Sequence, residues 1–230
     1  MALGRDPKEL EKTIGYTFRD ADLLPAALTH SSYANEMRGK IPGITSNERL
    51  EFLGDAILEE IVTRYLYTAF PDDGEGKLTI LRKAIVCEET LASAARSIEL
   101  GEYLFLGHGE EMQGSRALDS ILADALEALV AAVRLDGGIE QAEILIKKTV
   151  LSQKVSDADY KTRLQQLVQQ DGIEELSYRV VREDGPEHSK VFEVVAMINS
   201  NPVGRGTGKT KREAEQMAAR EALKLFGIRL

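Results

Sequence analysis

The spacing of apolar residues changes once along the chain, near residue 151. Before this point apolar residues recur with helical spacing, and the periodic segments are separated by turn sequences such as Pro71-Asp-Asp-Gly74 and Asp136-Gly-Gly138. This pattern predicts helices over residues 6–14, 20–30, 47–70, 75–99 (in one piece or two), 119–135 and 138–151. The first part of the chain is therefore expected to be all helical.

The rest of the chain has a different pattern. Residues 152–158 are short, polar and weakly patterned, and we expect a linker there. A predicted helix near 159–171 is followed by strands near 175–182, 190–199 and 202–207, a turn at Asn199-Ser-Asn-Pro202, and a helix over 211–226. This order predicts an all-α domain over residues 1–151, followed by a small α+β domain (α-β-β-β-α) over residues 159–228.

Two carboxylates interrupt the most apolar of the predicted helices. Between Ile121 and Val133, Asp124 and Glu127 are the only polar residues. A helix that is apolar on nearly all sides is usually buried, and a buried carboxylate is costly unless a cation or hydrogen-bond donors compensate its charge. The stretch itself contains no Lys, Arg or His, so the compensating charge is expected to come from elsewhere.

A second acidic group lies on the predicted helix 47–70. At 100° per residue, Glu48, Glu51 and Asp55 fall within about 60° of one another, where like charges repel. A Mg²⁺ ion, which prefers oxygen ligands, would relieve this repulsion. Two facing helices could then surround a metal with Glu51, Asp55, Asp124 and Glu127, although the acids of helix 47–70 alone also fit a solvated face.

Gly54 and Phe52 lie beside these acids. A glycine inside a helix costs about 1 kcal/mol relative to alanine, so Gly54 predicts the close approach of another backbone or a ligand. An exposed Phe52 next to a charged site suggests a surface for a partner protein. A phenylalanine covered by a neighbouring loop is the equal alternative.

The start of the last predicted helix combines a cap with positive charge. Thr210 and Glu213 form a Thr-x-x-Glu capping box, yet Lys211 and Arg212 occupy the first turn, where the helix dipole prefers acids. Together with Lys209 they predict a phosphate site at the helix N-terminus. The alternative is a solvated helix end.

The segment Gly204-Arg-Gly-Thr-Gly-Lys-Thr210 resembles a nucleotide-binding loop. That motif needs a glycine five positions before its Gly-Lys-Thr, and the residue there is Val203. We therefore expect no nucleotide cofactor.

The net charge and the cysteine content indicate what kind of partner and which cellular compartment to expect. The chain carries a net charge of -9, from 17 basic against 26 acidic residues in 1–156 and 12 against 12 in 157–230. The acidic part of the chain, residues 1–156, would repel phosphate groups until metal ions bind to it. Metal binding and nucleic-acid binding are therefore expected to be coupled. The single cysteine, Cys87, excludes a disulfide within the chain, favours a reducing compartment and is expected to pack within a helix.

Neither a membrane segment nor a histidine metal site is expected. No apolar run approaches the roughly 18 residues of a membrane span, and the N-terminus lacks the apolar region of a secretory signal. A cytoplasmic protein is therefore predicted. Of the three histidines, His30 is expected to make structural hydrogen bonds and His108 to lie in a loop, while His188 belongs to the other domain.

The segment Asn47-Glu-Arg-Leu-Glu-Phe-Leu-Gly-Asp-Ala56 resembles the signature of the ribonuclease III family. Its context is similar too, over Leu28-Thr-His-Ser-Ser-Tyr-Ala-Asn-Glu36, Glu75-Gly-Lys-Leu-Thr79, Asp119-Ser-Ile-Leu-Ala-Asp-Ala-Leu-Glu-Ala128 and Leu135-Asp-Gly-Gly138. The resemblance covers nearly the whole chain. It implies a helical endonuclease domain that forms a homodimer, followed by a double-stranded-RNA-binding domain.

The resemblance also implies roles for individual residues. It makes Glu51, Asp55, Asp124 and Glu127 ligands of Mg²⁺, for which Mn²⁺ can substitute, with Asp55 and Glu127 essential to the chemistry. Glu48 and Glu75 match further acids of the cleavage site, and Phe52 matches the residue that inserts into the partner subunit. The residues implied in RNA binding are Thr162, Gln165, Gln169, His188, Lys209, Thr210, Lys211 and Arg212.

The implied reaction is metal-assisted hydrolysis of double-stranded RNA, leaving 5′-phosphate and 3′-hydroxyl ends with short 3′ overhangs. Ribosomal RNA precursors and other structured transcripts, including messenger and transfer RNA, are the implied substrates. The chain departs from the usual pattern at Ser31, Ile80, Leu126 and Arg134, none of which is an acid. Two alternatives remain at this point: a double-stranded-RNA-binding protein that does not cleave, and a helical carboxylate hydrolase that acts on nucleotides.

Overall fold

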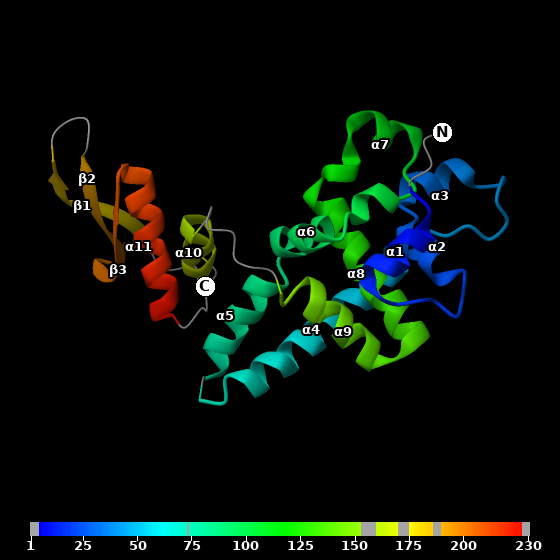
Figure 1. Cartoon of the computed structure of the whole chain (residues 1–230), viewed down its shortest axis with the longest axis horizontal. Helices are drawn as coiled ribbons and strands as arrows, with labels where there is room; N and C mark the ends of the chain where they lie inside the picture. Colours follow the sequence, from blue (N-terminus) through cyan, green and yellow to red (C-terminus); the bar gives the residue numbers. More distant parts are fainter. Residues whose placement is uncertain (1–4, 73, 153–159, 170–174, 186–189, 227–230) are drawn as a thin grey trace. The chain divides into compact units, whose positions relative to one another are not determined.

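The computed structural model describes residues 5–72, 74–152, 160–169, 175–185 and 190–226 (Figure 1). The chain divides into two compact units, Met1–Gln153 and Lys154–Leu230. The two units differ in secondary structure, since the strands in the described part of the chain all belong to the second. The change in apolar spacing near residue 151 therefore marks a change of architecture.

The first unit is built of helices. They are α1 (Pro7–Ile14), α2 (Leu23–Leu28), α3 (Ser31–Met37), α4 (Glu48–Ala69), α5 (Glu75–Ile85), α6 (Glu88–Ser97), α7 (His108–Gln113), α8 (Asp119–Gly137) and α9 (Ile139–Thr149), with short 3-10 helices η1 (Leu100–Tyr103) and η2 (Ser115–Ala117). Within the described residues no helix is both long and apolar enough to cross a membrane.

Helix α8 lies at the centre of the first unit. It packs against α2, α4, α6 and α9, and every residue from Ile121 to Val133 is buried except Asp124 and Glu127, which are half-buried. The expectation of a buried apolar helix is thus confirmed. Alanines on α8 keep this packing close, and Ala128 and Ala132 form a buried cluster with Ala27 of α2.

Helices α4 and α8 touch through their backbones at Gly54. A Cβ atom added there would overlap the carbonyl group of Glu127 and would lie 3.0 Å from its Cα. The prediction that Gly54 permits a close backbone approach is therefore confirmed. The buried edge of α4 is formed by Gly54, Leu58, Ile61, Val62 and Leu66.

The second unit combines a three-stranded sheet with two helices. Its elements are α10 (Tyr160–Gln169), β1 (Leu176–Asp184), β2 (Val191–Ile198), β3 (Asn201–Gly208) and α11 (Lys211–Leu225). The sheet is antiparallel with the order β1-β2-β3, α11 packs on β2 and β3, and α10 packs on α11. The predicted α-β-β-β-α order is confirmed.

The glycines of β3 are explained by the packing of α11. A Cβ atom at Gly204 or Gly206 would overlap backbone atoms of Ala218, and one at Gly208 would lie 2.5 Å from the backbone nitrogen of Ala214. These glycines alternate along the strand, so all three lie on the face that α11 covers. The glycines recur at every second position because α11 packs directly on the backbone of β3. This packing explains the glycines of the segment that resembles a nucleotide-binding loop.

Several local predictions were wrong. The helix expected over residues 20–30 is shorter, and α3 and α7 were not predicted. His108 begins α7 instead of lying in a loop. Cys87 is the N-cap residue of α6, with its Sγ 3.2 Å from Thr90 Oγ1, and so lies between two helices instead of within one. Residues 75–99 form two helices, which was one of the two options.

Candidate functional site

Three carboxylates from two helices meet in the first unit. Glu51 of α4 and Asp124 and Glu127 of α8 each offer an oxygen atom, and these oxygens all lie within 4.8 Å of one another. Asp124 and Glu127 share a face of α8 because they are three residues apart. Glu51 precedes Gly54 by one turn, so the backbone contact at Gly54 brings its carboxylate next to α8.

The carboxylates of this cluster hold their protons more tightly than free ones. Burial, followed by the charges of Asp55, Asp124 and Glu51, raises the pKa of Glu127 to about 8. Burial, then the charges of Asp124, Glu48 and Asp55, raises the pKa of Glu51. Burial and mutual repulsion both disfavour the ionised form, so the cluster needs positive charge to be stable when fully ionised.

Among the described residues, neither lysine nor arginine supplies that charge through an ion pair. Within the residues that the structure describes, no ion pair joins Glu51, Asp124 or Glu127 to a basic side chain. Three half-buried carboxylates without such partners fit a hard divalent cation with oxygen ligands, such as Mg²⁺. We call Glu51, Asp124 and Glu127 the acid cluster.

The other predicted acids lie outside the acid cluster. Asp55 is exposed and is not one of the three residues whose oxygens converge, although its charge acts on Glu51 and Glu127. Glu48 is exposed and accepts a hydrogen bond from the Ser46 hydroxyl at 2.6 Å. Glu75 is exposed at the start of α5 and accepts one from the Thr79 hydroxyl at 3.1 Å.

Two residues near Asp124 were not assigned to the site from the sequence. Burial and the charge of Glu88 raise the pKa of Asp124, whereas His30 lowers it. Glu88 is the first residue of α6 and reaches α8 only because these helices pack together. His30 makes the expected structural hydrogen bonds, to Ser32. Only long-range packing brings them to Asp124, and no local pattern signals that.

Phe52 follows Glu51 directly and remains at the surface of the first unit. Its side chain is 82% exposed, which makes it the most exposed large apolar residue in the described part of the chain. The alternative of a phenylalanine covered by a loop is therefore wrong for the single chain. An exposed aromatic ring next to the acid cluster is typical of a surface that contacts a partner.

The basic helix start of the second unit is capped as its sequence predicts. The hydroxyl of Thr210 accepts the Glu213 N–H at 3.1 Å, and the Glu213 carboxylate accepts the N–H of Lys209 at 2.7 Å. The second bond of the capping box thus goes to Lys209 instead of Thr210. Because the cap engages Glu213, this acid is held away from Lys211 and Arg212, and neither forms an ion pair in the described part of the chain.

The remaining predicted RNA-binding residues are only partly described. Thr162 is exposed and Gln165 is half-buried on α10. Gln169 ends α10, but its side chain and the whole of His188 lie outside the described residues. Lys211 is exposed, with its Nζ 5.6 Å from the ring centre of Phe192.

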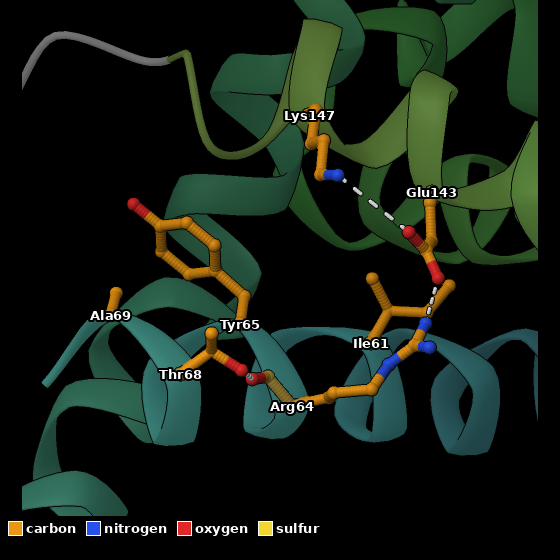
Figure 2. A pocket seen from close by; sticks show the side chains of 7 residues that line it. All are labelled: Ile61, Arg64, Tyr65, Thr68, Ala69, Glu143 and Lys147. Carbon is orange, nitrogen blue, oxygen red and sulfur yellow. Dashed lines mark hydrogen bonds and ion pairs between the residues drawn. The ribbon is translucent and has the colours of Figure 1, made fainter. Parts of the chain in front are cut away.

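A separate groove lies between α4 and α9, and the charged side chains that line it are paired with one another or with a neighbour. It encloses about 310 Å³. Figure 2 shows that Glu143 of α9 pairs with Arg64 of α4 and with Lys147, which lies one turn away on α9. Arg64 also pairs with Glu60 of its own helix, so both cations have an acidic partner. The lining residues are Ile61, Arg64, Tyr65, Thr68, Ala69, Glu143 and Lys147.

Without divalent cations, we expect the protein to lose stability as the pH rises from about 4.5 to about 8. The folded-state pKa of Glu127 is raised to about 8 from its ordinary value of 4.5. Between these values the folded chain keeps a proton that the unfolded chain releases, so the contribution of Glu127 to stability is largest at the low end of this range and falls until the folded pKa is passed.

Melting temperatures in EDTA at about pH 5 and about pH 9 test this expectation. The fall should be larger in the wild type than in Glu127→Gln, by about 2–4 °C. That corresponds to ~1 kcal/mol, a figure already reduced because the half-buried side chain is screened by solvent. Equal falls in the two proteins would contradict the assignment of a raised pKa to Glu127.

Comparisons with known proteins agree with this geometry. A family model described as "Ribonuclease-III-like" matches residues 20–154, and one described as "Double-stranded RNA binding motif" matches residues 160–225. The protein "Ribonuclease 3" of Pelotomaculum thermopropionicum is 48% identical over 221 residues, covering 93% of this chain and 90% of that protein. The "Ribonuclease 3" of Caldanaerobacter subterraneus is 48% identical over 225 residues, covering 95% and 97%.

A solved structure is similar as well. The nuclease domain of ribonuclease III from Campylobacter jejuni, described as having structural flexibility in a "region involved in dimer formation", matches with a TM-score of 0.56. It is 41% identical, and the match covers 63% of this chain and 98% of that one. The family match extends over more than half of the chain, and the two curated relatives match it nearly end to end. The chain belongs to the ribonuclease III family.

Proposed function

We propose that this chain hydrolyses phosphodiester bonds in double-stranded RNA, in a reaction that depends on Mg²⁺. The observation that carries the proposal is the acid cluster, where oxygens of three half-buried carboxylates converge without a basic partner among the described residues. A second unit that matches a double-stranded-RNA-binding motif supplies the affinity for the substrate. The protein is a double-stranded-RNA-specific endoribonuclease.

In the proposed mechanism Glu51, Asp124 and Glu127 hold the cation. A bound Mg²⁺ supplies Lewis-acid activation of water and neutralises charge on the phosphate oxygens. Asp55, exposed beside the cluster, and Glu127 act on the reacting groups, and Glu48 and Glu75 belong to the surrounding acidic surface. Until a cation is bound, these acids repel RNA phosphates, so loading of the metal and productive binding of RNA are coupled.

The second unit binds the duplex through its backbone and shape. Lys209, Lys211, Arg212 and the amides at the start of α11 contact phosphates across a groove. Residues of α10, including Thr162 and Gln165, address 2′-hydroxyls in the minor groove, with Gln169 and His188 as further contacts. Recognition of this type depends on the A-form geometry and very little on base sequence.

The proposed active form is a homodimer. The exposed Phe52 next to the acid cluster supports a two-fold interface in which the same patch occurs on both subunits. With one acid cluster per subunit, each subunit cuts one strand and the two cuts leave short 3′ overhangs with 5′-phosphate and 3′-hydroxyl ends. Structured transcripts and ribosomal RNA precursors in the cytoplasm are the proposed substrates.

Incubation with long duplex RNA tests the function. We expect cleavage in Mg²⁺ or Mn²⁺, none in EDTA, and none of single-stranded RNA of the same sequence. The main products should be cut in both strands with staggered ends, since the proposed dimer carries two centres. Binding of duplex RNA in Ca²⁺ with no cleavage in Mg²⁺ would instead favour the non-cleaving RNA-binding protein, and nicked duplex alone would contradict the dimer.

Replacing Lys211 and Arg212 together with alanine should weaken binding to all duplex sequences alike. If both side chains contact phosphates, the slope of log affinity against log salt should flatten by roughly one to two units. Binding assays over a range of salt concentrations measure this slope. The double variant Arg205→Ala/Lys224→Ala removes one arginine and one lysine that are paired with Glu193 and Glu221, and serves as the control. An equal change in the control would mean that net charge alone is responsible.

A further inference from the structure

A pocket of about 510 Å³ lies within the second unit, between the start of α10 and α11. The described residues that line it include Tyr160 of α10, the N-cap residue Thr210, and Arg212, Gln216 and Arg220 of α11. Neither arginine forms an ion pair within the residues that the structure describes. In this respect the pocket differs from the groove between α4 and α9, where both cations are paired.

The guanidinium of Arg220 is held by an aromatic ring and not by an acid. Its Cζ lies 5.8 Å from the ring centre of Tyr160, which is within the range of an attractive cation–π contact. Tyr160 itself is buried, so its ring is a fixed support. Arg220 Nε is also buried and has no hydrogen-bond partner in the described part of the chain. The cation is therefore partly desolvated but not neutralised, and this favours an anion that accepts from its other N–H donors.

The two cations in the first turn of α11 lie on different sides of the helix. Lys211 turns toward β2, where its Nζ lies 5.6 Å from the ring centre of Phe192, whereas Arg212 lines the pocket. Arg212 and Arg220 are eight positions apart, so on an α-helix they lie within about 80° of each other and about 12 Å apart along the axis. Arg212 therefore shares a site with Arg220 and not with Lys211.

The wall of the pocket between the two arginines is fixed by contacts with α10. Gln216 Oε1 accepts the backbone N–H of Lys161 at 3.1 Å, and Lys161 Nζ pairs with Glu215 at 2.6 Å. Glu213 is the only acid among the described lining residues, and its carboxylate accepts the N–H of Lys209 at 2.7 Å. With two arginines against one acid, the pocket carries a net positive charge.

We propose that Arg212 and Arg220 together bind one phosphate group of the RNA backbone in this pocket, as a contact separate from that of Lys211. The inference rests on the proposed binding of duplex RNA by the second unit. A guanidinium presents several N–H donors in a fixed plane that matches the oxygens of a phosphate. Such a contact fixes the position of the duplex and carries no information about base sequence. It extends the RNA-binding surface along α11 as far as Tyr160.

Arg220→Met is the variant that tests this contact. The unbranched apolar side chain can still pack on Tyr160, but the charge is lost. We expect the full-length protein to bind duplex RNA in Ca²⁺ about tenfold more weakly, and the slope of log affinity against log salt to flatten by about one unit, since one phosphate contact is lost. Arg220→Lys keeps the charge and should retain most of the slope.

Lys224→Met is the matched control. It removes one positive charge from the same helix, one turn beyond Arg220, but this lysine pairs with Glu221. The control should leave the salt slope nearly unchanged. An equal change of slope in Arg220→Met and Lys224→Met would overturn the proposal. So would a lower melting temperature of Arg220→Met with an unchanged slope, because Arg220 would then only support Tyr160.

A double-mutant cycle tests whether the two arginines share one phosphate. If they do, Arg212→Ala/Arg220→Met should bind only slightly more weakly than either single variant, with a slope flatter by about one unit. The losses in Lys211→Ala/Arg220→Met should instead multiply, and the slope should flatten by about two units. Independent losses in both pairs would contradict a shared phosphate.

The wild-type protein distinguishes failure of this inference from failure of the proposed function. If the wild type binds duplex RNA in Ca²⁺ and Arg220→Met binds it with the same affinity and slope, the proposed role of the second unit stands and only the pocket is excluded. If the wild type does not bind duplex RNA, the proposed role of the second unit and the pocket fall together.

Discussion

Glu127→Gln is expected to abolish cleavage of duplex RNA, with a loss of at least about a thousandfold in rate, or ~4 kcal/mol of transition-state stabilisation. The substitution keeps the size of the side chain but removes a carboxylate oxygen from the acid cluster, where Glu127 lies with Glu51 and Asp124. Binding of duplex RNA in Ca²⁺ should stay close to that of the wild type, because the substitution leaves the second unit, which matches a double-stranded-RNA-binding motif, unchanged.

Glu143→Gln is the matched control for this prediction. Glu143 is also a glutamate of the first unit, but it pairs with Arg64 and Lys147 in the groove between α4 and α9. Its rate of cleavage should stay within a fewfold of the wild-type rate. Turnover by Glu127→Gln at a near wild-type rate in Mg²⁺ would remove Glu127 from the reaction centre.

Gly54→Ala is expected to destabilise the first unit strongly. The added Cβ would overlap the carbonyl group of Glu127, and because this is backbone, α4 and α8 must separate. Overpacking of this kind costs about 3 kcal/mol or more, which lowers the melting temperature of a domain of this size by roughly 6–12 °C. The separation also carries Glu51 away from Glu127, so Mn²⁺ binding should weaken.

Gly76→Ala provides the comparison. Gly76 lies in α5, and a Cβ there meets nothing within 4 Å. Alanine is favoured over glycine in a helix by up to about 1 kcal/mol, so this variant should be as stable as the wild type or slightly more stable. A loss of stability at Gly54 no larger than at Gly76 would show that the backbones of α4 and α8 can adjust.

The features predicted correctly from the sequence are those that depend on local pattern. The change of apolar spacing separated the helical unit from the α+β unit, and the two acids in an apolar stretch indicated a buried, charged centre on α8. Gly54 predicted its own close contact because a glycine inside a helix is otherwise unfavourable. In each case the sequence signal lies within a few residues of the structural feature that it predicts.

The position of Asp55 shows where a helical projection is insufficient. Spacing puts Glu51 and Asp55 in one sector, but the contact between helices is made at Gly54. At 100° per residue Glu51 lies about 60° from Gly54 around the helix, whereas Asp55 lies about 100° away and toward solvent. The shared side of the helix was therefore predicted correctly. The position of Gly54, where α4 touches α8, determines that Glu51 faces α8 and Asp55 faces solvent.

The short helices, and the contacts between residues distant in sequence, could not be predicted from local sequence pattern. Helix α3 has seven residues and is capped by a histidine, and α7 has six residues, so neither contains a full amphipathic repeat. Glu88 and His30 approach Asp124 from α6 and from the start of α3. Residues distant in sequence can be assigned to a site only after the packing of the helices is known.

The three glycines of β3 have a consequence for how the second unit engages RNA. Since α11 rests on the strand backbone itself through Gly204, Gly206 and Gly208, its axis and rotation are set without flexible side chains between them. The capped turn that carries Lys211 and Arg212 is thereby fixed in place before the proposed phosphate contacts form. Preorganisation lowers the entropy lost on association, so the domain can gain affinity from a small number of contacts and still release the duplex after cleavage.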